Sequence, residues 1–228
     1  GLTSPYTNSI SGGEKIYVRV KNNATGCIKT DNSFNLIVNP LPKANVVSNI
    51  IKCDDNSVGD DKDGFISTFD LSSQTATILG NQDPNIFEVS YHLSQNDSDD
   101  LTKTGLSSPH TNVSANGDKI FVRVLNKNTN CYRSTTSFET QVAPLPKVKP
   151  LIVIEQCDDD DDNDGVSVHN LTESQLIISD DYQNETFEYY TSSDLNSNSL
   201  ISDPTKFEND PFSDTVYVKI ITSDNCFR

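Results

Sequence analysis

The chain repeats itself with a period of 104 residues. When the sequence is shifted by this distance, residues 1–43 fall on residues 105–147, and 22 of these 43 positions are identical. The runs Ile-Tyr-Val-Arg-Val and Ile-Phe-Val-Arg-Val coincide without a gap, as do the two Pro-Leu-Pro segments. A weaker third copy contains Val-Tyr-Val-Lys-Ile at residues 216–220. Repeats of about 100 residues are whole domains in tandem, which usually provide length and display rather than an active site.

The repeat divides the chain into three modules, which we call the first, second and third repeat. We expect residues 1–43 to be the C-terminal part of a β-sandwich module, residues 44–147 a complete module, and residues 148–228 a module lacking its last strand. Because the outer copies are incomplete, we expect the chain to belong to a longer array. The Pro-Leu-Pro segments then act as semi-rigid spacers between modules, or as ordinary strand ends with edge prolines.

The pattern within one repeat predicts an all-β fold. In the second repeat, apolar and polar residues alternate over 87–93 and 120–124, and residues 45–52 and 137–142 are further candidate strands. Residues 71–80 predict one short helix that ends at Gly80, and residues 95–104 a polar loop. Short strands separated by Gly, Asn, Asp and Pro turns favour tandem immunoglobulin-like or fibronectin-like β-sandwich modules with one short helix each.

Composition limits both the core and the partners. Only 34% of the residues are hydrophobic, with no Trp or Met, so each module buries a thin core and needs staples such as disulfides or metal. The net charge of −16 argues against nucleic-acid binding, which needs a basic face, and against adsorption to an anionic membrane. We therefore expect neither nucleic-acid binding nor membrane insertion, and the charge suits a protein that holds divalent cations.

The five cysteines occupy two positions of the repeat. Cys53 and Cys157 precede acidic runs, whereas Cys27, Cys131 and Cys226 follow the Val-Arg-Val strand or its counterpart. The simplest pairing closes each module on itself through Cys53–Cys131 and Cys157–Cys226, and Cys27 then pairs upstream of residue 1. A rival pairing, Cys27–Cys53 with Cys131–Cys157, links neighbouring modules. Either pattern implies an oxidising compartment outside the cytoplasm, and buried free thiols are the remaining alternative.

The acidic runs are candidate Ca²⁺ loops. Residues 160–165 contain Asp-x-Asp-x-Asp-Gly, in which alternate carboxylates and a turn-forming glycine let one loop surround a hard cation. The run after Cys53 is longer and looser, and neither loop has the closing Glu or the helices of an EF-hand. The alternative is a solvated acidic turn. The candidate ligands are Asp158, Asp160, Asp162, Asp164 and Asn170 in the third repeat, and Asp54, Asp55, Asp61, Asp63 and Asp70 in the second.

No catalytic constellation is present in the sequence. His92, His110 and His169 are not at equivalent repeat positions, and we interpret them as isolated surface histidines. Zinc-binding, nucleophile-elbow and phosphate-loop motifs are absent. The aromatic residues Tyr17, Phe121, Tyr189, Tyr190 and Tyr217 either stack on sugars or pack against Arg and Lys on a sheet face. We therefore expect a chain that is not an enzyme.

The ordered set of motifs resembles a known class of repeat. It runs Cys-Asp-Asp-(acidic)-Asp-Gly-Phe, Phe-Asp-Leu, Ile-Leu-Gly-Asn-Gln-Asp-Pro, Val-Ser-Tyr-His, Leu-Ser-Ser-Pro-x-Thr-Asn, Ile-Phe-Val-Arg-Val-x-Asn-x-x-Thr-x-Cys and Pro-Leu-Pro. These motifs resemble the tandem modules of very large secreted proteins of gliding Bacteroidetes, which commonly end in a gliding-motility-associated type IX secretion sorting domain. The resemblance implies an extracellular or cell-surface location and an adhesin-like role.

These observations favour a non-catalytic structural or adhesive stalk in a long secreted cell-surface protein, with modules stabilised by disulfides and Ca²⁺ and a role in surface adhesion or gliding. Its partners are then neighbouring repeats of the same chain and a surface glycan or protein ligand. The alternatives are a glycan- or protein-binding module that uses exposed aromatics, and an accessory region of a secreted enzyme.

Overall fold

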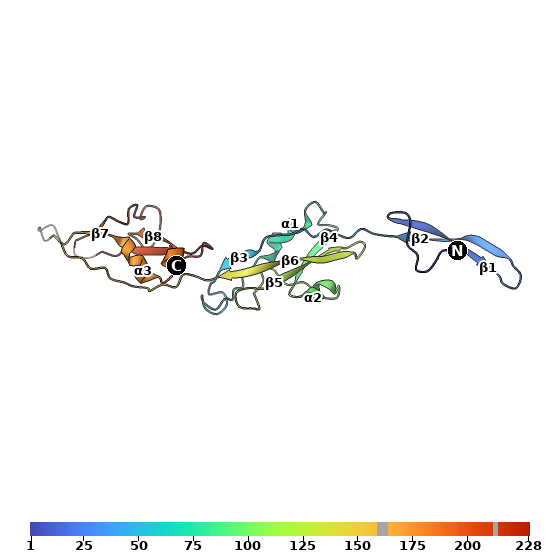
Figure 1. Cartoon of the computed structure of the whole chain (residues 1–228), viewed down its shortest axis with the longest axis horizontal. Coiled ribbons are helices and arrows are strands. Elements are labelled where there is room, and N and C mark those ends of the chain that lie inside the picture. The colour runs from blue at the N-terminus through green and yellow to red at the C-terminus, as the bar shows by residue number, and fades with distance from the viewer. Residues whose placement is uncertain (159–163, 212–213) are drawn as a thin grey trace. The chain divides into compact units, whose positions relative to one another are not determined.

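The computed structural model describes residues 1–158, 164–211 and 214–228 (Figure 1). The chain is mostly β with few short helices, as the sequence predicts. The first repeat contains β1 (Gly13–Lys21) and β2 (Ile28–Ile37). The second contains β3 (Ile50–Cys53), the 3₁₀ turn η1 (Leu71–Gln74), α1 (Thr75–Leu79), β4 (Phe87–His92), α2 (Gln95–Asp99), β5 (Lys119–Asn126) and β6 (Tyr132–Ala143). The third contains β7 (Val168–His169), η2 (Leu171–Ser174), α3 (Gln175–Ile178), η3 (Tyr182–Asn184), β8 (Thr186–Tyr190), β9 (Phe207–Glu208) and β10 (Tyr217–Ile221).

The chain packs as two compact units that interleave along the sequence. One unit comprises Gly1–Ser48, Leu71–Ser107 and Lys119–Phe138. The other comprises Asn49–Asp70, Ser108–Asp118 and Glu139–Arg228. The repeat boundaries and the unit boundaries therefore differ, because strand β6 of the second repeat contributes residues to both units.

The first unit holds two antiparallel strand pairs. β1 pairs with β2, and β4 pairs with β5. Alternate residues of β5, Ile120, Val122 and Val124, are fully buried, which is the period-two pattern that the sequence predicts. The ring of Tyr91 on β4 meets the ring of Phe138 on β6 edge to face, with centroids 6.1 Å apart. This alternation places the core of the second repeat on one face of its sheet.

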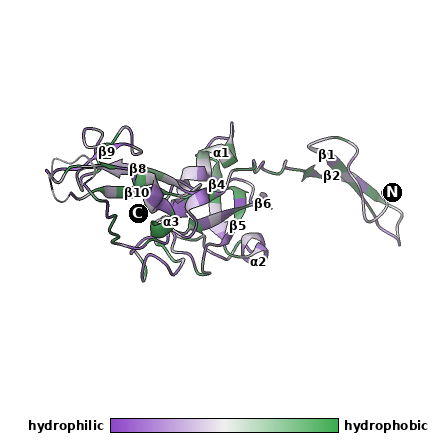
Figure 2. Cartoon of the chain, turned by 60° about the vertical axis from the view of Figure 1, so that its left-hand side comes forward, coloured by the Kyte–Doolittle hydropathy of each residue, from purple (hydrophilic) through white to green (hydrophobic). Residues whose placement is uncertain are grey.

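The two helices of the second repeat begin and end through local hydrogen bonds. The residue after α1, Gly80, has a φ of 58° and donates its N–H to the carbonyl of Ala76, so the predicted stop is confirmed. The segment 95–104, predicted to be a polar loop, instead begins with α2. The side chain of Ser94 caps the N-terminus of this helix by accepting the N–H of Asp97. α2 is hydrophilic, whereas β5 carries hydrophobic residues (Figure 2). The serine cap lets a polar run form a helix without an apolar face.

The sheet of the second repeat has the strand order β3-β6-β5-β4. In the second unit, β3 pairs in parallel with the end of β6, so that Cys53 lies opposite Ala143. Ile66 and Phe69 of the same unit are fully buried. The first cysteine of the second repeat is thereby placed at the far end of the closing strand β6.

The third repeat is built on smaller sheets. β10 pairs with β8, and β7 pairs with β9, both antiparallel. The 3₁₀ turn η2 is capped by Asn170, which accepts the N–H of Thr172. Among the described residues, no helix combines the length and the apolar character that crossing a membrane requires.

Candidate functional site

One disulfide joins the second repeat to the third. It links Cys53, at the end of β3, to Cys226, which is fully buried in the turn after β10. The two Cα atoms are 5.4 Å apart, although the residues are separated by 173 positions in the sequence. The Sγ atom of Cys226 lies 3.9 Å from the carbonyl oxygen of Ala143, which also accepts the N–H of Asp54. The third repeat is thus covalently attached where the sheet of the second repeat ends.

The same turn presents the second cysteine of every repeat. In the third repeat, Thr222 donates its N–H to the carbonyl of Cys226. Asn225, the residue before this cysteine, has a left-handed φ of 63°. The corresponding turns have Gly26 at φ 73° before Cys27 and Asn130 at φ 57° before Cys131. Only glycine and asparagine readily adopt this conformation. The turn therefore places a cysteine identically at the end of each β-hairpin.

The expected pairs Cys53–Cys131 and Cys157–Cys226 are wrong in the structure, and so is the rival set. Cys131 immediately precedes β6, whereas Cys53 pairs with the last residue of the same strand. Twelve residues of strand separate these positions by roughly 40 Å, far beyond the ~7 Å that a disulfide can span. Cys27 and Cys157 are exposed free thiols and Cys131 is a half-buried one. The pairing of Cys27 upstream of residue 1 stays a prediction.

These features define a β-repeat chain in which a disulfide joins one repeat to the next. A family model described as the Flavobacterium inter-domain disulphide bond domain matches residues 1–42, 49–146 and 153–228, and the chain belongs to this family. The match supports one part of the resemblance seen in the sequence, namely that the chain is similar to flavobacterial proteins with repeated domains. Neither a curated protein nor a solved structure matches the chain.

The first aspartate of each acidic loop closes the loop. Asp54 is buried, and its Oδ2 atom accepts the N–H of Gly64 at 2.9 Å while Oδ1 accepts the N–H of Asp55. In the third repeat, Oδ2 of Asp158 accepts the N–H of Gly165 at 3.0 Å. Gly64 has a φ of 78°, and a Cβ there would lie 2.8 Å from the backbone nitrogen of Asn116. The aspartate and the glycine therefore form a repeated structural clasp.

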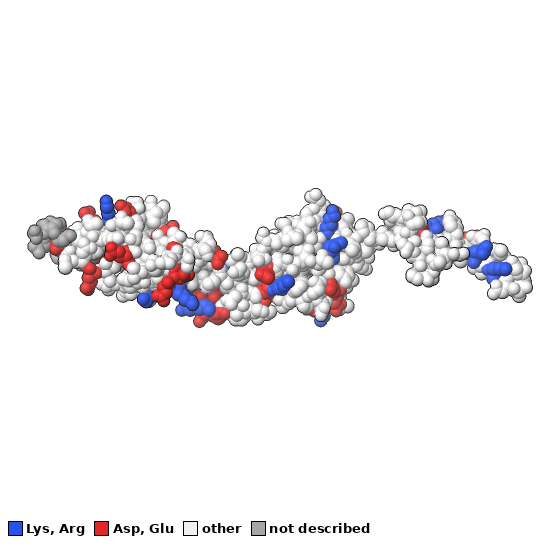
Figure 3. Space-filling model, viewed as in Figure 1, with Lys and Arg blue, Asp and Glu red and all other residues white. Residues whose placement is uncertain are grey.

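The other candidate ligands of the second repeat have protein partners. Asp61 forms an ion pair with Arg228, Asp63 accepts the N–H of Phe65, and Asp70 accepts the hydroxyl of Ser108. Asp55 accepts the N–H of Ser57. These contacts scatter the carboxylates instead of converging them. Acidic side chains lie in several separate groups on the face in Figure 3, and Lys or Arg lies beside some of them.

The loop of the third repeat is described only in part. Asp164 accepts the N–H of Val166, and Asn170 caps η2. Asp160 and Asp162 lie outside the described residues. Within residues 1–158, 164–211 and 214–228, no group of three or more His, Cys, Asp or Glu side chains could hold a metal ion. In the first loop, backbone N–H groups and Arg228 engage oxygens of these aspartates, and Ca²⁺ binding there stays a prediction.

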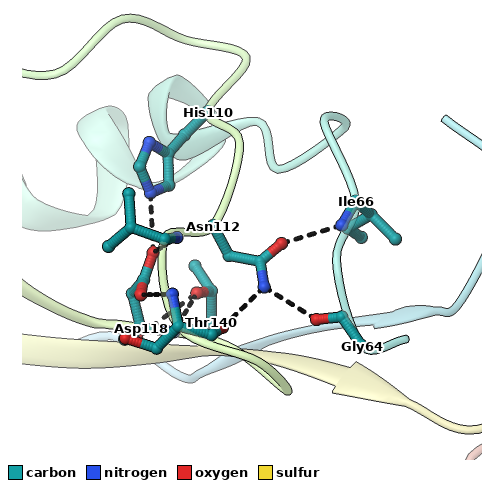
Figure 4. Close-up of polar contacts among 8 residues, drawn as sticks. Gly64, Ile66, His110, Asn112, Asp118 and Thr140 are labelled. Carbon is teal, nitrogen blue, oxygen red and sulfur yellow. Dashed lines mark hydrogen bonds and ion pairs between the residues drawn. The ribbon is translucent and has the colours of Figure 1, made fainter. Parts of the chain in front are cut away.

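A buried polar network supports the clasp in the second repeat (Figure 4). The side chain of Asn112 accepts the N–H of Ile66 at 2.8 Å and donates to the carbonyl of Gly64 at 2.8 Å. Asp118 accepts from His110 Nε2 at 2.9 Å and donates its backbone N–H to Thr140 on β6. His110 is therefore not the surface histidine that the sequence suggests. The network ties the end of the acidic loop to the closing strand.

The network recurs with different side chains. In the first repeat, Tyr6 and Glu14 occupy the positions of His110 and Asp118, and the Tyr6 hydroxyl donates to the Glu14 carboxylate. In the third repeat, Asn209 accepts the N–H of Ser167 and donates to the carbonyl of Gly165, as Asn112 does in the second. In the sequence, this element is visible only as the spacing Tyr-x-Asn at 6–8 and His-x-Asn at 110–112.

The remaining histidine and aromatic positions are mostly structural. His92 is buried with Nε2 at 2.9 Å from the Ser90 hydroxyl, and burial followed by the charge of Arg123 lowers its pKa. Tyr189 and Tyr190 are buried, which removes them from any sugar-stacking surface. Lys15 and Lys119 lie over the rings of Tyr17 and Phe121, each 5.4 Å from the centroid. The aromatics thus favour packing on the sheet face over a glycan platform.

Proposed function

We propose that this chain is a non-catalytic stalk segment of a long secreted cell-surface protein, acting in surface adhesion or gliding. The observation that carries the proposal is the disulfide between Cys53 and Cys226, which makes two successive repeats one covalent unit. Such a bond suits a chain that transmits load. It forms and persists in oxidising compartments, which supports a location outside the cytoplasm and, for a flavobacterial protein, secretion by the type IX route.

The repeat extends this pairing along an array. In Cys53–Cys226 the first cysteine of one repeat joins the second cysteine of the next. The same rule pairs Cys157 with a following repeat, and Cys131 and Cys27 with preceding repeats, outside residues 1–228. Successive covalent loops then overlap, so that every repeat lies inside two of them. Non-reduced peptide mapping of a longer natural chain tests the rule, and a bond between the two cysteines of one repeat would contradict it.

The proposal includes Ca²⁺ binding by the acidic loop of the third repeat. Residues 160–165 carry the Asp-x-Asp-x-Asp-Gly pattern, and hard oxygen ligands in this spacing suit Ca²⁺. We expect the thermal midpoint of the non-reduced, chelated chain to rise with Ca²⁺ and not with Mg²⁺, because a ligand that binds only the native state stabilises it. No rise with either ion would make the acidic runs solvated turns, and an equal rise with both would show a site that does not select Ca²⁺.

Cell-surface exposure tests the stalk itself. We expect protease added to intact cells to remove the full-length protein that contains these repeats, and deletion of its gene to reduce attachment to a surface. Protection from protease until the cells are lysed would overturn the proposal. If a strain that lacks the protein attached as well as the wild type, the protein would have a structural role without adhesion.

A further inference from the structure

An ion pair between the second and third repeats lies beside the disulfide. Arg228 donates from Nη2 to the Oδ2 atom of Asp61 in the acidic loop, and both residues belong to the second compact unit. Cys53 begins this loop, and Arg228 follows Cys226 by two residues, so the ion pair joins the same two segments as the bond. Each charged side chain is 28% exposed, so solvent screens the pair only in part. The two repeats are therefore joined by an electrostatic contact in addition to the covalent one.

The backbone holds both partners in place. Arg228 donates its N–H to the carbonyl of Ile220 at 3.1 Å and accepts the N–H of Ile220 at 2.9 Å, which fixes it beside β10. The other aspartates of the acidic loop accept N–H groups of residues 57–65: Asp54, Asp55, Asp60 and Asp63. Asp61 instead contacts Arg228. The hydrogen bonds within the loop thus leave this carboxylate directed at the next repeat.

A cation follows the second cysteine at the same spacing in every repeat. Only 17 of the 228 residues are Lys or Arg, yet one of them stands two positions after each second cysteine: Lys29, Arg133 and Arg228. Arg133 also contacts the repeat before its own, because its Nε–H donates to the carbonyl of Pro42 at 2.9 Å. Lys29 is exposed. The position of this cation in the repeat therefore places it where a preceding repeat ends.

The first cysteine of a repeat has surroundings of the opposite charge. Residues 54–63 after Cys53 contain five aspartates and one lysine, and residues 158–164 after Cys157 contain six aspartates. Opposite charges attract and like charges repel over about 10 Å at 0.1 M salt. Charge therefore favours a bond between a first and a second cysteine over a bond between two cysteines of the same repeat position. Because β6 separates the two cysteines of one repeat, the partner comes from another repeat.

We propose that the ion pair between Asp61 and Arg228 directs disulfide formation to the correct pair of cysteines. This inference rests on the proposed array of disulfides between repeats and assigns a role to the charges beside them. The acidic loop after a first cysteine recognises the Cys-x-Lys or Cys-x-Arg turn of the next repeat and raises the effective concentration of the two thiols. Because thiol–disulfide exchange is reversible, the pair that the ion pair stabilises accumulates.

Oxidative refolding of the intact chain tests this role. The reduced chain is equilibrated in a glutathione buffer, in which glutathione disulfide takes two electrons and two protons from two cysteine thiols and becomes two glutathione molecules. Non-reduced peptide mapping then gives the ratio of the bond Cys53–Cys226 to all other pairs. We expect Asp61→Lys to lower this ratio about three- to tenfold, because it replaces an attraction by a repulsion. Asp60→Lys makes the same change in charge at an exposed neighbour that accepts the N–H of Lys62, and it should lower the ratio less than about twofold.

An exchange of the two charges separates this role from a general effect on stability. Arg228→Glu alone should lower the ratio as Asp61→Lys does, and the two changes together should restore it to within about twofold of the wild type. No loss with Asp61→Lys, an equal loss with Asp60→Lys, or no restoration in the double variant would overturn the directing role and leave the pairing between repeats intact. If the wild type did not form Cys53–Cys226, both the pairing and the role of the ion pair would be overturned.

Discussion

At the scale of single residues, one carboxylate holds each acidic loop. Asp54 and Asp158 accept the N–H of a glycine ten and seven residues further along the chain. The first aspartate after the cysteine is therefore a structural residue, whereas the sequence presents it as one ligand among many. A run of identical side chains gives no sign of which member faces inward, and only the turn at the following glycine decides it.

Replacement of Asp54 by alanine tests this role. The change leaves two backbone N–H groups near a buried site without an acceptor, and we expect a loss of about 1–3 kcal/mol in the free energy of unfolding. Asp60→Ala is the control, because the side chain of Asp60 is exposed and accepts the N–H of Lys62. This change should cost no more than about 0.5 kcal/mol. Both are measured by urea unfolding with chelator. Equal losses would contradict the clasp.

The buried His92 makes stability depend on pH. Burial and the charge of Arg123 lower its pKa, so the unfolded state binds a proton more readily than the folded state. Its contribution is complete above the unfolded pKa near 6.5 and is lost as pH falls from there through the folded value. We expect His92→Gln to lose less stability than the wild type between pH 7.5 and 5.5 in urea unfolding. An unchanged pH slope would contradict this, and His169→Gln is the control.

At the scale of elements, Arg123 attaches α2 to the sheet. Its guanidinium is buried and donates to the carbonyls of Asp100 and Lys103, just beyond the end of α2, at 2.6 and 2.9 Å. A helix of five residues is marginal by itself, so this bidentate contact holds it in place. The arginine of the repeated Val-Arg-Val strand is therefore a structural anchor in the second repeat.

The substitution Arg123→Lys tests this anchor. A single ammonium cannot reproduce the planar pair of hydrogen bonds, and we expect a loss of about 2 kcal/mol in the free energy of unfolding. Amide exchange at Ser98 and Asp100 should accelerate at the same time. Arg133→Lys is a matched control, because Arg133 donates its Nε–H to the carbonyl of Pro42. Similar acceleration at α2 in both variants would show that the helix does not depend on Arg123.

The sequence predicts most strands of the second repeat, but not how they pair. Alternation identifies β4 and β5, because one face of each is buried. It misses α2, whose helix depends on the Ser94 cap rather than on apolar periodicity. It also cannot show that β3 pairs in parallel with the end of β6, since that contact joins segments about 90 residues apart. The disulfide prediction failed for this reason: the cysteines of one repeat lie at opposite ends of β6.

At the scale of the whole molecule, the disulfide stabilises by restricting the unfolded chain. It closes a loop with a sequence separation of 173 residues, which corresponds to about 5 kcal/mol in the chain-entropy model. We expect Cys53→Ser to lower the free energy of unfolding by up to this amount without reductant. Cys27→Ser, which removes an exposed free thiol, should leave it unchanged. If reductant lowered the stability of wild type and Cys53→Ser equally, the bond would not be the source.

The same loop determines how far the chain extends under load. When the chain is pulled from its two ends, the bond carries force directly between Cys53 and Cys226, and the residues between them cannot lengthen it. At full extension these 173 positions correspond to about 600 Å. We would stretch single molecules of a chain in which Cys27, Cys131 and Cys157 are changed to Ser. Its maximum extension should be shorter by this length until reductant is added. Cys53→Ser in that background should release it without reductant, because the covalent path is then the whole chain. Equal extension of the two chains before reduction would mean that the bond does not bear the load, and the resistance of these repeats to stretching would depend on folding alone.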